Sequence, residues 1–380
     1  MARKDRPLYR CADTALVRAA AHAELALPIC PDLTDGATAN VQQCRSWLRA
    51  VWALNVVVGA VEHASPALAR QVEEVCAAKN PDAQQARRTV LSVLRYLLRL
   101  QHRATPFGMF AGVAPASFGA ELAVRWGTQH RALTRADASW IADVITRLES
   151  CPHLLARLPL MTNNLVFVRG DRLIVPYPPW TRDETITPAE VSLRYTSTVR
   201  MAVEAARSPI RYAELVEKLA AEFPTTPPSK VDGLVTGLVY RRVLISSLHA
   251  PSTVIDAFGY LLRELESVSA SDIPQVADLA HQLRDIGKEL ARHNQAATTA
   301  ASRAIRTTAA EKMTALSATA RQPLAADLLV DCSLVLPRKV AQEAEAAAVA
   351  LARLSANPFG TAAWKSYHNR FFIRTTGSRP

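Results

Sequence analysis

Apolar residues recur at helical spacing along most of this chain, and the periodicity predicts its main elements. Helices are predicted over residues 43–63, 84–102, 137–149, 196–207, 212–223, 229–242, 256–293 with an interruption near 267–274, and 338–354. Ser65-Pro66 predicts the start of one more helix, because serine caps helix N-termini and proline suits the first helical position. Thr105-Pro106 ends the long helix before it, since a residue that precedes proline avoids the helical region.

Alternating or continuous apolar runs predict strands over residues 107–114, 122–126, 243–248 and 327–337. The clearest local signal is "NLVFVRGDRLIVPY" (Asn164 to Tyr177), in which two apolar runs flank Gly170-Asp171 and predict a tight hairpin. Residues 7–31 carry a mixed, irregular pattern, and residues 295–320 are low in complexity. The fold class is therefore α+β, with mixed helices and antiparallel sheets.

The hairpin, the three short helices after it and the strand at 243–248 occur in an order that suits a winged-helix-like module. This order divides the chain into domains at 1–163, 164–250 and 251–380. DNA binding is the alternative for such a module, but its third helix has only Lys230, Arg241 and Arg242 as basic residues. That helix would read a DNA groove poorly.

Composition adds a charge argument. The chain has 380 residues and a formal net charge of +11, with arginine far ahead of lysine. The excess favours an anionic partner such as RNA, although arginine- and alanine-rich composition also follows from GC-rich coding sequence. No apolar run is long enough to span a bilayer, and no secretory signal opens the chain, so we expect a cytoplasmic protein. Six scattered cysteines without metal-ligand spacing predict free thiols and no metal site.

Arginines mark one face of the helix predicted at 84–102. Arg88, Arg95, Arg99 and Arg103 are seven, four and four residues apart, which forms a basic stripe that ends at the helix C-terminus. Such a stripe is often solvated or paired with carboxylates. The apolar run at 107–114 argues that this helix end lies near the core, where an arginine needs an acidic partner or a ligand.

The sequence at this point, "RLQHRATPFGMFAGVA", resembles the signature of the lantibiotic dehydratases in the N-terminal part of their glutamylation domain. The matching positions are Arg99, Arg103, Thr105, Pro106, Phe107, Gly108, Phe110 and Gly112. "ALVRAA", "SWLRAVWALNVVVGAVEHASPAL", "RADASWIADVITRLE" and "YHNRFFIR" resemble other segments of the family, so the resemblance covers nearly the whole chain.

The resemblance implies an activity. These enzymes transfer glutamate from glutamyl-tRNA to Ser and Thr of a ribosomally made precursor peptide, then eliminate it. It implies catalytic positions at Arg99, Arg103, Thr105 and Asp137, and RNA- or glutamyl-binding positions at Arg18, Arg95, Arg99 and Arg103. A guanidinium stays protonated and so cannot be the general base. Asp137 and Asp327, a second acidic candidate, would pair with the arginines or assist the incoming hydroxyl; we favour pairing.

The resemblance also implies partners. The winged-helix-like module would hold the leader of the precursor as an added strand, and glutamyl-tRNA would be the co-substrate, with no bound cofactor. A downstream dehydratase chain, a cyclase and a second copy of this chain are further candidate partners; DNA is not expected.

The family's glutamylation part is about twice this long, and "RTTGSRP" departs from the family pattern. We therefore expect a truncated chain, from a broken gene or a split enzyme. Two hypotheses stay open: a glutamylation enzyme, and a non-catalytic remnant that at most binds leader peptide or RNA.

Overall fold

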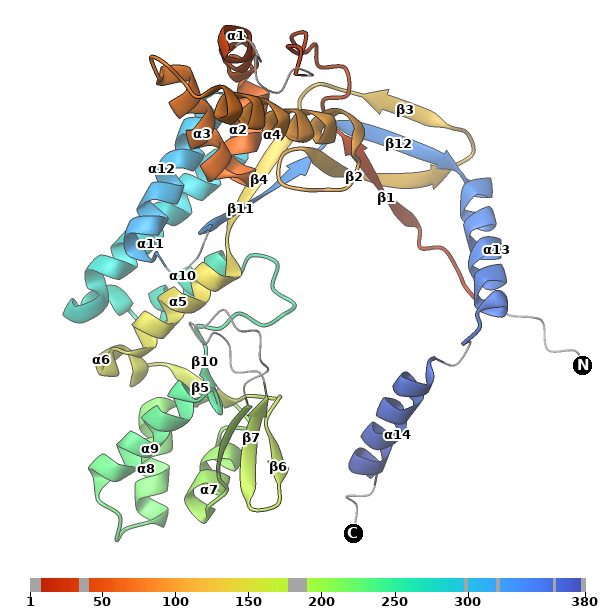
Figure 1. Cartoon of the computed structure of the whole chain (residues 1–380). Coiled ribbons are helices and arrows are strands. Elements are labelled where there is room, and N and C mark those ends of the chain that lie inside the picture. Colours follow the sequence, from red (N-terminus) through yellow and green to blue (C-terminus); the bar gives the residue numbers. More distant parts are fainter. Residues whose placement is uncertain are drawn as a thin grey trace, which may run out of the picture. The chain divides into compact units, whose positions relative to one another are not determined.

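The structure is a computed structural model that describes residues 8–33, 41–176, 190–296, 300–318, 322–357 and 360–376 (Figure 1). The chain forms two compact units, one of residues 1–132 with 327–380 and one of residues 133–326. The predicted boundaries near 163 and 250 both fall within the second unit and stay predictions. Tyr177, the last residue of the predicted hairpin, lies outside the described residues.

The first unit combines a helical body with a mixed sheet. Its elements are β1 (Thr14–Ala20), α1 (Val41–Trp52), α2 (Asn55–Ala64), α3 (Pro66–Ala77), α4 (Ala83–His102), β2 (Ala111–Gly119), β3 (Ala123–Trp126), β12 (Cys332–Pro337), α13 (Arg338–Leu354) and α14 (Ala362–Thr376). Two further strands, β4 (Arg131–Ala136) and β11 (Leu324–Leu329), carry the chain across the boundary between the units.

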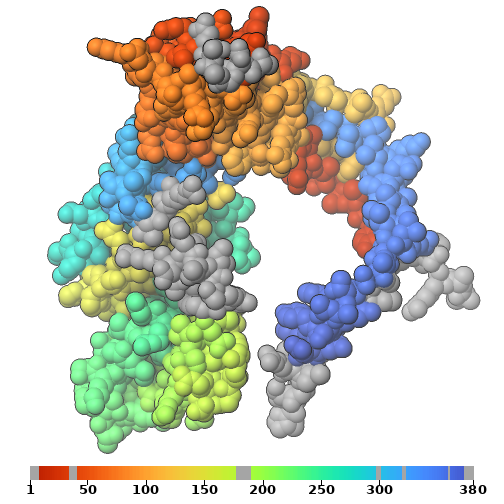
Figure 2. Space-filling view, viewed as in Figure 1, coloured from red at the N-terminus to blue at the C-terminus, as the bar shows by residue number. Residues whose placement is uncertain are grey.

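Helices α1 to α4 pack into one continuous body (Figure 2). Ser65 caps α3 as predicted, because its side chain accepts a hydrogen bond from the Leu68 backbone N–H. The prediction of a single helix over 43–63 is wrong, because the helix is interrupted between Trp52 and Asn55. Neither glycine nor proline stands at the break, and the apolar pattern runs on through it, so the sequence carries no local stop signal.

Strand β2 is central to the sheet of the first unit. It pairs antiparallel with β1 and parallel with β11 and β12, while β12 pairs antiparallel with β3. The predicted antiparallel pairing is therefore present, and the sheet also contains parallel pairs that the sequence did not predict. Parallel pairing needs a long connection, and nearly the whole second unit lies in sequence between β2 and β11. The strand predicted at 327–337 is likewise two strands, β11 and β12, separated at Val330-Asp331.

The second unit is a helical core with two small sheets. Its elements are α5 (Ala138–Glu149), α6 (Pro152–Leu155), β5 (Pro159–Thr162), β6 (Phe167–Arg169), β7 (Arg172–Pro176), β8 (Glu190–Arg194), α7 (Ser197–Ala205), β9 (Ile210–Arg211), α8 (Tyr212–Glu222), α9 (Pro228–Tyr240), β10 (Leu244–Ser246), α10 (Ala257–Ser267), a 3₁₀ turn (Ala270–Asp272), α11 (Pro274–Gln295) and α12 (Ala300–Leu316). Leucines, valines and Trp140 from these helices fill its core.

The predicted hairpin is confirmed. Arg169 faces Arg172 across the two-residue loop Gly170-Asp171, and Gly170 has a φ of +61°, a conformation that favours glycine. Strand β8, which the sequence did not predict, joins the hairpin to make the sheet β6-β7-β8. The predicted closing strand, β10, pairs instead with β5 in a second sheet, β10-β5-β9. The chain order fits the α+β prediction, and the winged-helix interpretation stays a prediction.

Helices α13 and α14 close the described chain with little burial. No residue of α13 is buried, and its apolar Leu351 and Leu354 are exposed. Trp364 and Tyr367 of α14 stack on each other and are also exposed. Among the described residues, no helix is long and apolar enough to cross a membrane.

Candidate functional site

Helix α4 carries the arginine stripe on its outer face. Asp82 caps the helix by accepting a hydrogen bond from the Gln85 backbone N–H at 2.7 Å. Val90, Val93, Leu97 and Leu100 are among the residues of the inner face that are buried in the helical body. Arg88 and Arg95 are exposed on the other side, and Arg99 is half-buried. The periodicity therefore predicts this face correctly.

The end of α4 lies at the surface, which corrects the expectation that it is near the core. Arg103 is the C-cap residue in an extended conformation, and every residue from 102 to 107 is exposed, Thr105 included. The predicted strand over 107–114 begins only at Ala111. Residues 107–110 instead form a turn in which the Phe110 N–H donates to the Phe107 carbonyl at 3.1 Å. Phe110 supplies the burial that the apolar pattern indicates, with an exposed fraction of 1%.

Both glycines of the motif have a structural reason. Gly108 adopts a φ of +52° in the turn, where a side chain would strain the backbone. Gly112 lies where β2 and β11 approach closely, and a Cβ atom there would be 2.3 Å from the Leu328 carbonyl oxygen. The glycines therefore fix the turn and the strand that follow the arginines.

Arg99 stacks on an aromatic ring. Its guanidinium carbon lies 4.3 Å from the centre of the Phe107 ring, a cation–π contact. The Arg99 Nε atom is buried and has no hydrogen-bond partner among the described residues. None of the side chains of Arg88, Arg95, Arg99 and Arg103 forms an ion pair within the part of the chain that the structure describes. The interpretation as a carboxylate-paired stripe therefore receives no support there.

Strand β1 brings Arg18 into the same unit. Arg18 is exposed and stands opposite Val113 of β2. Helix α4 contacts β1, and the Gln101 side-chain amide donates to the Leu25 carbonyl at 2.9 Å, which ties the helix end to the segment after β1. Arg18, Arg95, Arg99, Arg103 and Thr105 thus belong to one unit built on α4, β1 and β2.

The two predicted carboxylates fall in different units, Asp327 in the first with the arginines and Asp137 in the second. Asp137, in the second unit, is the N-cap of α5, and its carboxylate accepts hydrogen bonds from the Ser139 N–H at 2.8 Å and from the Ser139 hydroxyl. Asp327 is exposed on β11, the strand that pairs with β2 at Leu329–Val113. Asp137 therefore has a structural role that the helix start at 137 could have indicated.

A histidine pair near the end of β1 escaped the sequence interpretation. The His130 ring lies within 3.0 Å of the Ala21 carbonyl oxygen through Nε2, and Nδ1 accepts from the Asp331 N–H at 3.0 Å. Burial, and then the nearby His130, lower the pKa of His22 to about 4. His22 is therefore neutral near pH 7, and its ring lies edge-on to the His130 ring at 5.7 Å between centres. The two hydrogen bonds of His130 link the residue after β1 to the β11–β12 turn. No motif spacing marks these residues.

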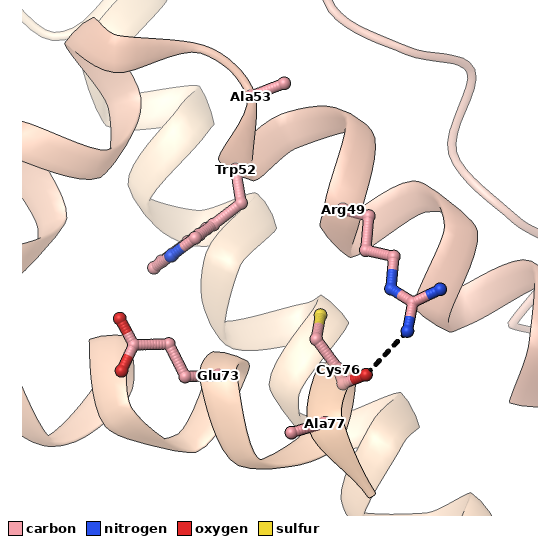
Figure 3. A pocket seen from close by; sticks show the side chains of 6 residues that line it. All are labelled: Arg49, Trp52, Ala53, Glu73, Cys76 and Ala77. Carbon is pink, nitrogen blue, oxygen red and sulfur yellow. Dashed lines mark hydrogen bonds between the residues drawn. The ribbon is translucent and has the colours of Figure 1, made fainter. Parts of the chain in front are cut away.

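A pocket of about 500 Å³ opens between α1 and α3 (Figure 3). Trp52 and Glu73 face it from opposite sides, and the Arg49 guanidinium donates to the Cys76 carbonyl at 2.7 Å. The Trp52 Nε1 atom is buried and has no hydrogen-bond partner among the described residues. None of the residues predicted for the site is among its six lining residues.

Comparison with known proteins agrees with the signature at the end of α4. The family model "Lantibiotic dehydratase, N terminus" matches residues 53–375. The chain belongs to the lantibiotic dehydratase family. It is 30% identical over 206 residues to the subtilin biosynthesis protein SpaB of Bacillus subtilis, and 22% identical over 190 residues to the epidermin biosynthesis protein EpiB of Staphylococcus epidermidis. These matches cover 54% and 48% of this chain and 19% of each relative.

Two solved structures extend the comparison. The tRNA-dependent lantibiotic dehydratase MibB from Microbispora sp. 107891 superposes with a TM-score of 0.78 at 28% identity, over 96% of this chain and 33% of MibB. The glutamylation domain TbtB from thiomuracin biosynthesis has a TM-score of 0.51 at 18% identity, over 78% of this chain and 34% of its own, and shares the fold. This dehydratase-family chain thus spans about a third of the solved proteins that it resembles and a fifth of its curated relatives.

Proposed function

We propose that this chain supplies the glutamyl-tRNA-binding part of a glutamylation domain that modifies Ser and Thr of a precursor peptide. The observation that carries the proposal lies at the C-terminal end of α4 and the turn after it, residues 95–110, which we call the α4 corner. There, exposed arginines without carboxylate partners among the described residues adjoin the family signature. The likeness to MibB supports it, because MibB is a tRNA-dependent lantibiotic dehydratase. In the transfer, a peptide hydroxyl attacks the glutamyl ester carbonyl, and the RNA terminal hydroxyl leaves.

In this proposal the arginines bind and orient the anionic groups of the substrate. Arg95 and Arg103 are exposed and would neutralise phosphates near the RNA end, while Arg99 and Arg18 would bind phosphate or the glutamyl carboxylate. Thr105 would orient the ester through its hydroxyl. Guanidinium groups stay protonated, so the proton of the attacking hydroxyl goes to another group, for which Asp327 is the candidate in the same unit.

Leader-peptide binding is the second part of the proposal. The sheet β6-β7-β8 has two edge strands, and β6 is exposed along its length with Phe167 and Val168 open to solvent. An extended peptide can add to such an edge through backbone hydrogen bonds. Proline at Val168 or at Ser192 would block β6 or β8 in turn, and loss of leader binding in one variant would identify the edge. Unchanged binding in both would contradict strand addition.

Activity is tested by incubating the chain with glutamyl-tRNA and a candidate precursor and by measuring glutamate adducts on the peptide by mass spectrometry. The reaction is run alone and with a separately produced chain that covers the rest of a dehydratase. Adducts that require the second chain support a split enzyme, and Arg103→Ala should remove them. If no adduct forms in either case while leader or RNA still binds, the chain is a binding module, which is the alternative function.

A further inference from the structure

We infer that Phe107, with Arg99 against its ring, is a stacking platform for an unpaired nucleobase at the end of the bound RNA. This inference rests on the proposed RNA-binding function and adds a contact to a base, where the arginines contact charge. It starts from a feature that the arginine assignment does not explain. An aromatic ring with an exposed fraction of 41% lies at the end of the basic stripe.

The ring is held rigidly from the core side. Phe107 and Phe110 have ring centres 5.9 Å apart, and Phe110 in turn lies 5.4 Å from the Tyr96 ring of α4. Phe110 is almost fully buried, and the turn fixed by Gly108 joins it to Phe107 through the 3.1 Å backbone hydrogen bond. A platform anchored in this way loses little conformational entropy when a planar group stacks on it.

The partner chemistry follows from what surrounds the ring. Single-stranded nucleic acids are held by aromatic or guanidinium planes that stack on bases, combined with cations that follow the phosphates. Here both planes occur in one contact, Phe107 with Arg99, while Arg95 on the same helix and Arg103 at its C-cap are exposed cations. An unpaired base with its adjoining phosphates fits this combination.

The test uses the full chain and two RNA hairpins that carry the same short single-stranded 3′ overhang. One overhang is intact, and in the other the terminal bases are replaced by abasic sites, so the phosphates are unchanged. Fluorescence anisotropy gives both dissociation constants. We expect the intact overhang to bind about tenfold more tightly, within the range of about 5- to 150-fold that stacking of one base gives.

Variants then test whether the Phe107 ring causes the ratio between the two dissociation constants. Phe107→Leu keeps an apolar side chain without a π face and should bring the ratio to about one while binding of the abasic hairpin is retained; Phe107→Trp should keep the ratio. Leu98→Ala is the matched control, because Leu98 is an exposed apolar residue on the same helix. A thermal melt of each variant checks folding, and retention in Phe107→Trp excludes a folding defect as the cause.

The outcomes separate the two proposals. If the wild type binds both hairpins equally, or if Phe107→Leu keeps the ratio, the platform is wrong while RNA binding stands. If the wild type binds neither hairpin, the proposed RNA-binding function fails, and the platform fails with it.

Discussion

Two arginines beside helix ends show how differently this chain uses the same side chain. Arg242 follows α9, its side chain is 13% exposed, and its Nη1 atom lies 2.6 Å from the Glu149 carboxylate. Arg99 lies in the last turn of α4, stacks on Phe107 and has no carboxylate partner among the described residues. The charge of Arg242 is neutralised by a carboxylate of the chain itself, whereas the arginines at the α4 corner can bind an anionic ligand.

The Arg242 corner is built as a closed network. Glu149 accepts hydrogen bonds from the Ser246 hydroxyl at 2.8 Å and lies 3.2 Å from His249 Nε2, while Arg242 also donates to Thr146. The helix ends with two backbone bonds, from Val243 N–H to Leu238 and from Arg242 N–H to Val239, both 2.9 Å long. This pattern places Arg242 in the left-handed region, with a φ of 60°. The network holds Arg242 in a strained backbone conformation, and this indicates that the Arg242 corner has a structural role.

The largest effect that we predict breaks this network. Glu149→Ala leaves Arg242 without its partner in a mostly buried site and should lower the free energy of unfolding by about 3 kcal/mol, measured by urea denaturation. The control is Glu190→Ala, which removes an exposed ion pair with Arg169 and should cost less than about 1 kcal/mol. Equal losses in the two variants would remove the distinction between buried and exposed pairs.

The Glu149 effect also has a pH dependence. Burial raises the pKa of Glu149, but the His249 hydrogen bond and the Arg242 charge, followed by the Ser246 hydrogen bond, outweigh it, and the pKa lies below its usual 4.5. A lowered pKa contributes stability above the unfolded value, which is lost as the pH falls through the folded value. The difference between wild type and Glu149→Ala should therefore shrink below about pH 4.5. A constant difference across the acidic range would contradict the ion pair.

A smaller effect separates the backbone from the side chain at the same corner. Arg242→Ala and Arg242→Gly both lose the Glu149 contact, but only glycine adopts the left-handed conformation without strain. We expect the glycine variant to be more stable than the alanine variant by about 1 kcal/mol in the same denaturation experiment. An alanine variant as stable as the glycine variant would show that the positive φ carries no strain.

The contrast between the corners also shows what the sequence could predict. Periodicity correctly predicts α4, its arginine face and the stop at Thr105-Pro106, because these features follow from local spacing and from proline sterics. It does not predict that the end of α4 is exposed, since burial at Met109 and Phe110 gives the same apolar pattern as a buried strand. The stacking of Arg99 on Phe107 depends on the turn at Gly108, which spacing alone does not determine.

Long-range pairing and compositional bias account for the other differences. Parallel pairing of β2 with β11 and β12 joins segments separated by the second unit, and no local pattern encodes it. Helix α12 forms within the alanine- and threonine-rich stretch where periodicity is weak, although Ala309 and Met313 are buried. The predicted site residues came from the family resemblance. The structure sets Asp137 apart from the others, because it shows Asp137 as the N-cap of α5.

For Asp137, a predicted site residue, a structural role can be tested against a role in the reaction. Its carboxylate caps α5 through the Ser139 N–H, so Asp137→Ala should lower the free energy of unfolding by about 1 kcal/mol. Asp137→Asn keeps a good capping group and should stay within about 0.5 kcal/mol of wild type. A loss of peptide glutamylation in the stable asparagine variant would show that the charge acts in the reaction as well as at the cap.

Replacement of Arg99 should change stability little and RNA binding strongly. Arg99→Ala removes a cation–π contact of about 0.5–1 kcal/mol but also removes a buried Nε without a partner, so the free energy of unfolding should change by less than about 1 kcal/mol. RNA binding should weaken clearly, and the slope of log K against log salt should fall by about one if Arg99 contacts a phosphate. Arg242→Ala should do the reverse, with a large loss of stability and unchanged RNA affinity in conditions where it is folded. If both variants lost stability and RNA binding together, the two corners would not be separable into a structural arginine and a ligand-binding one.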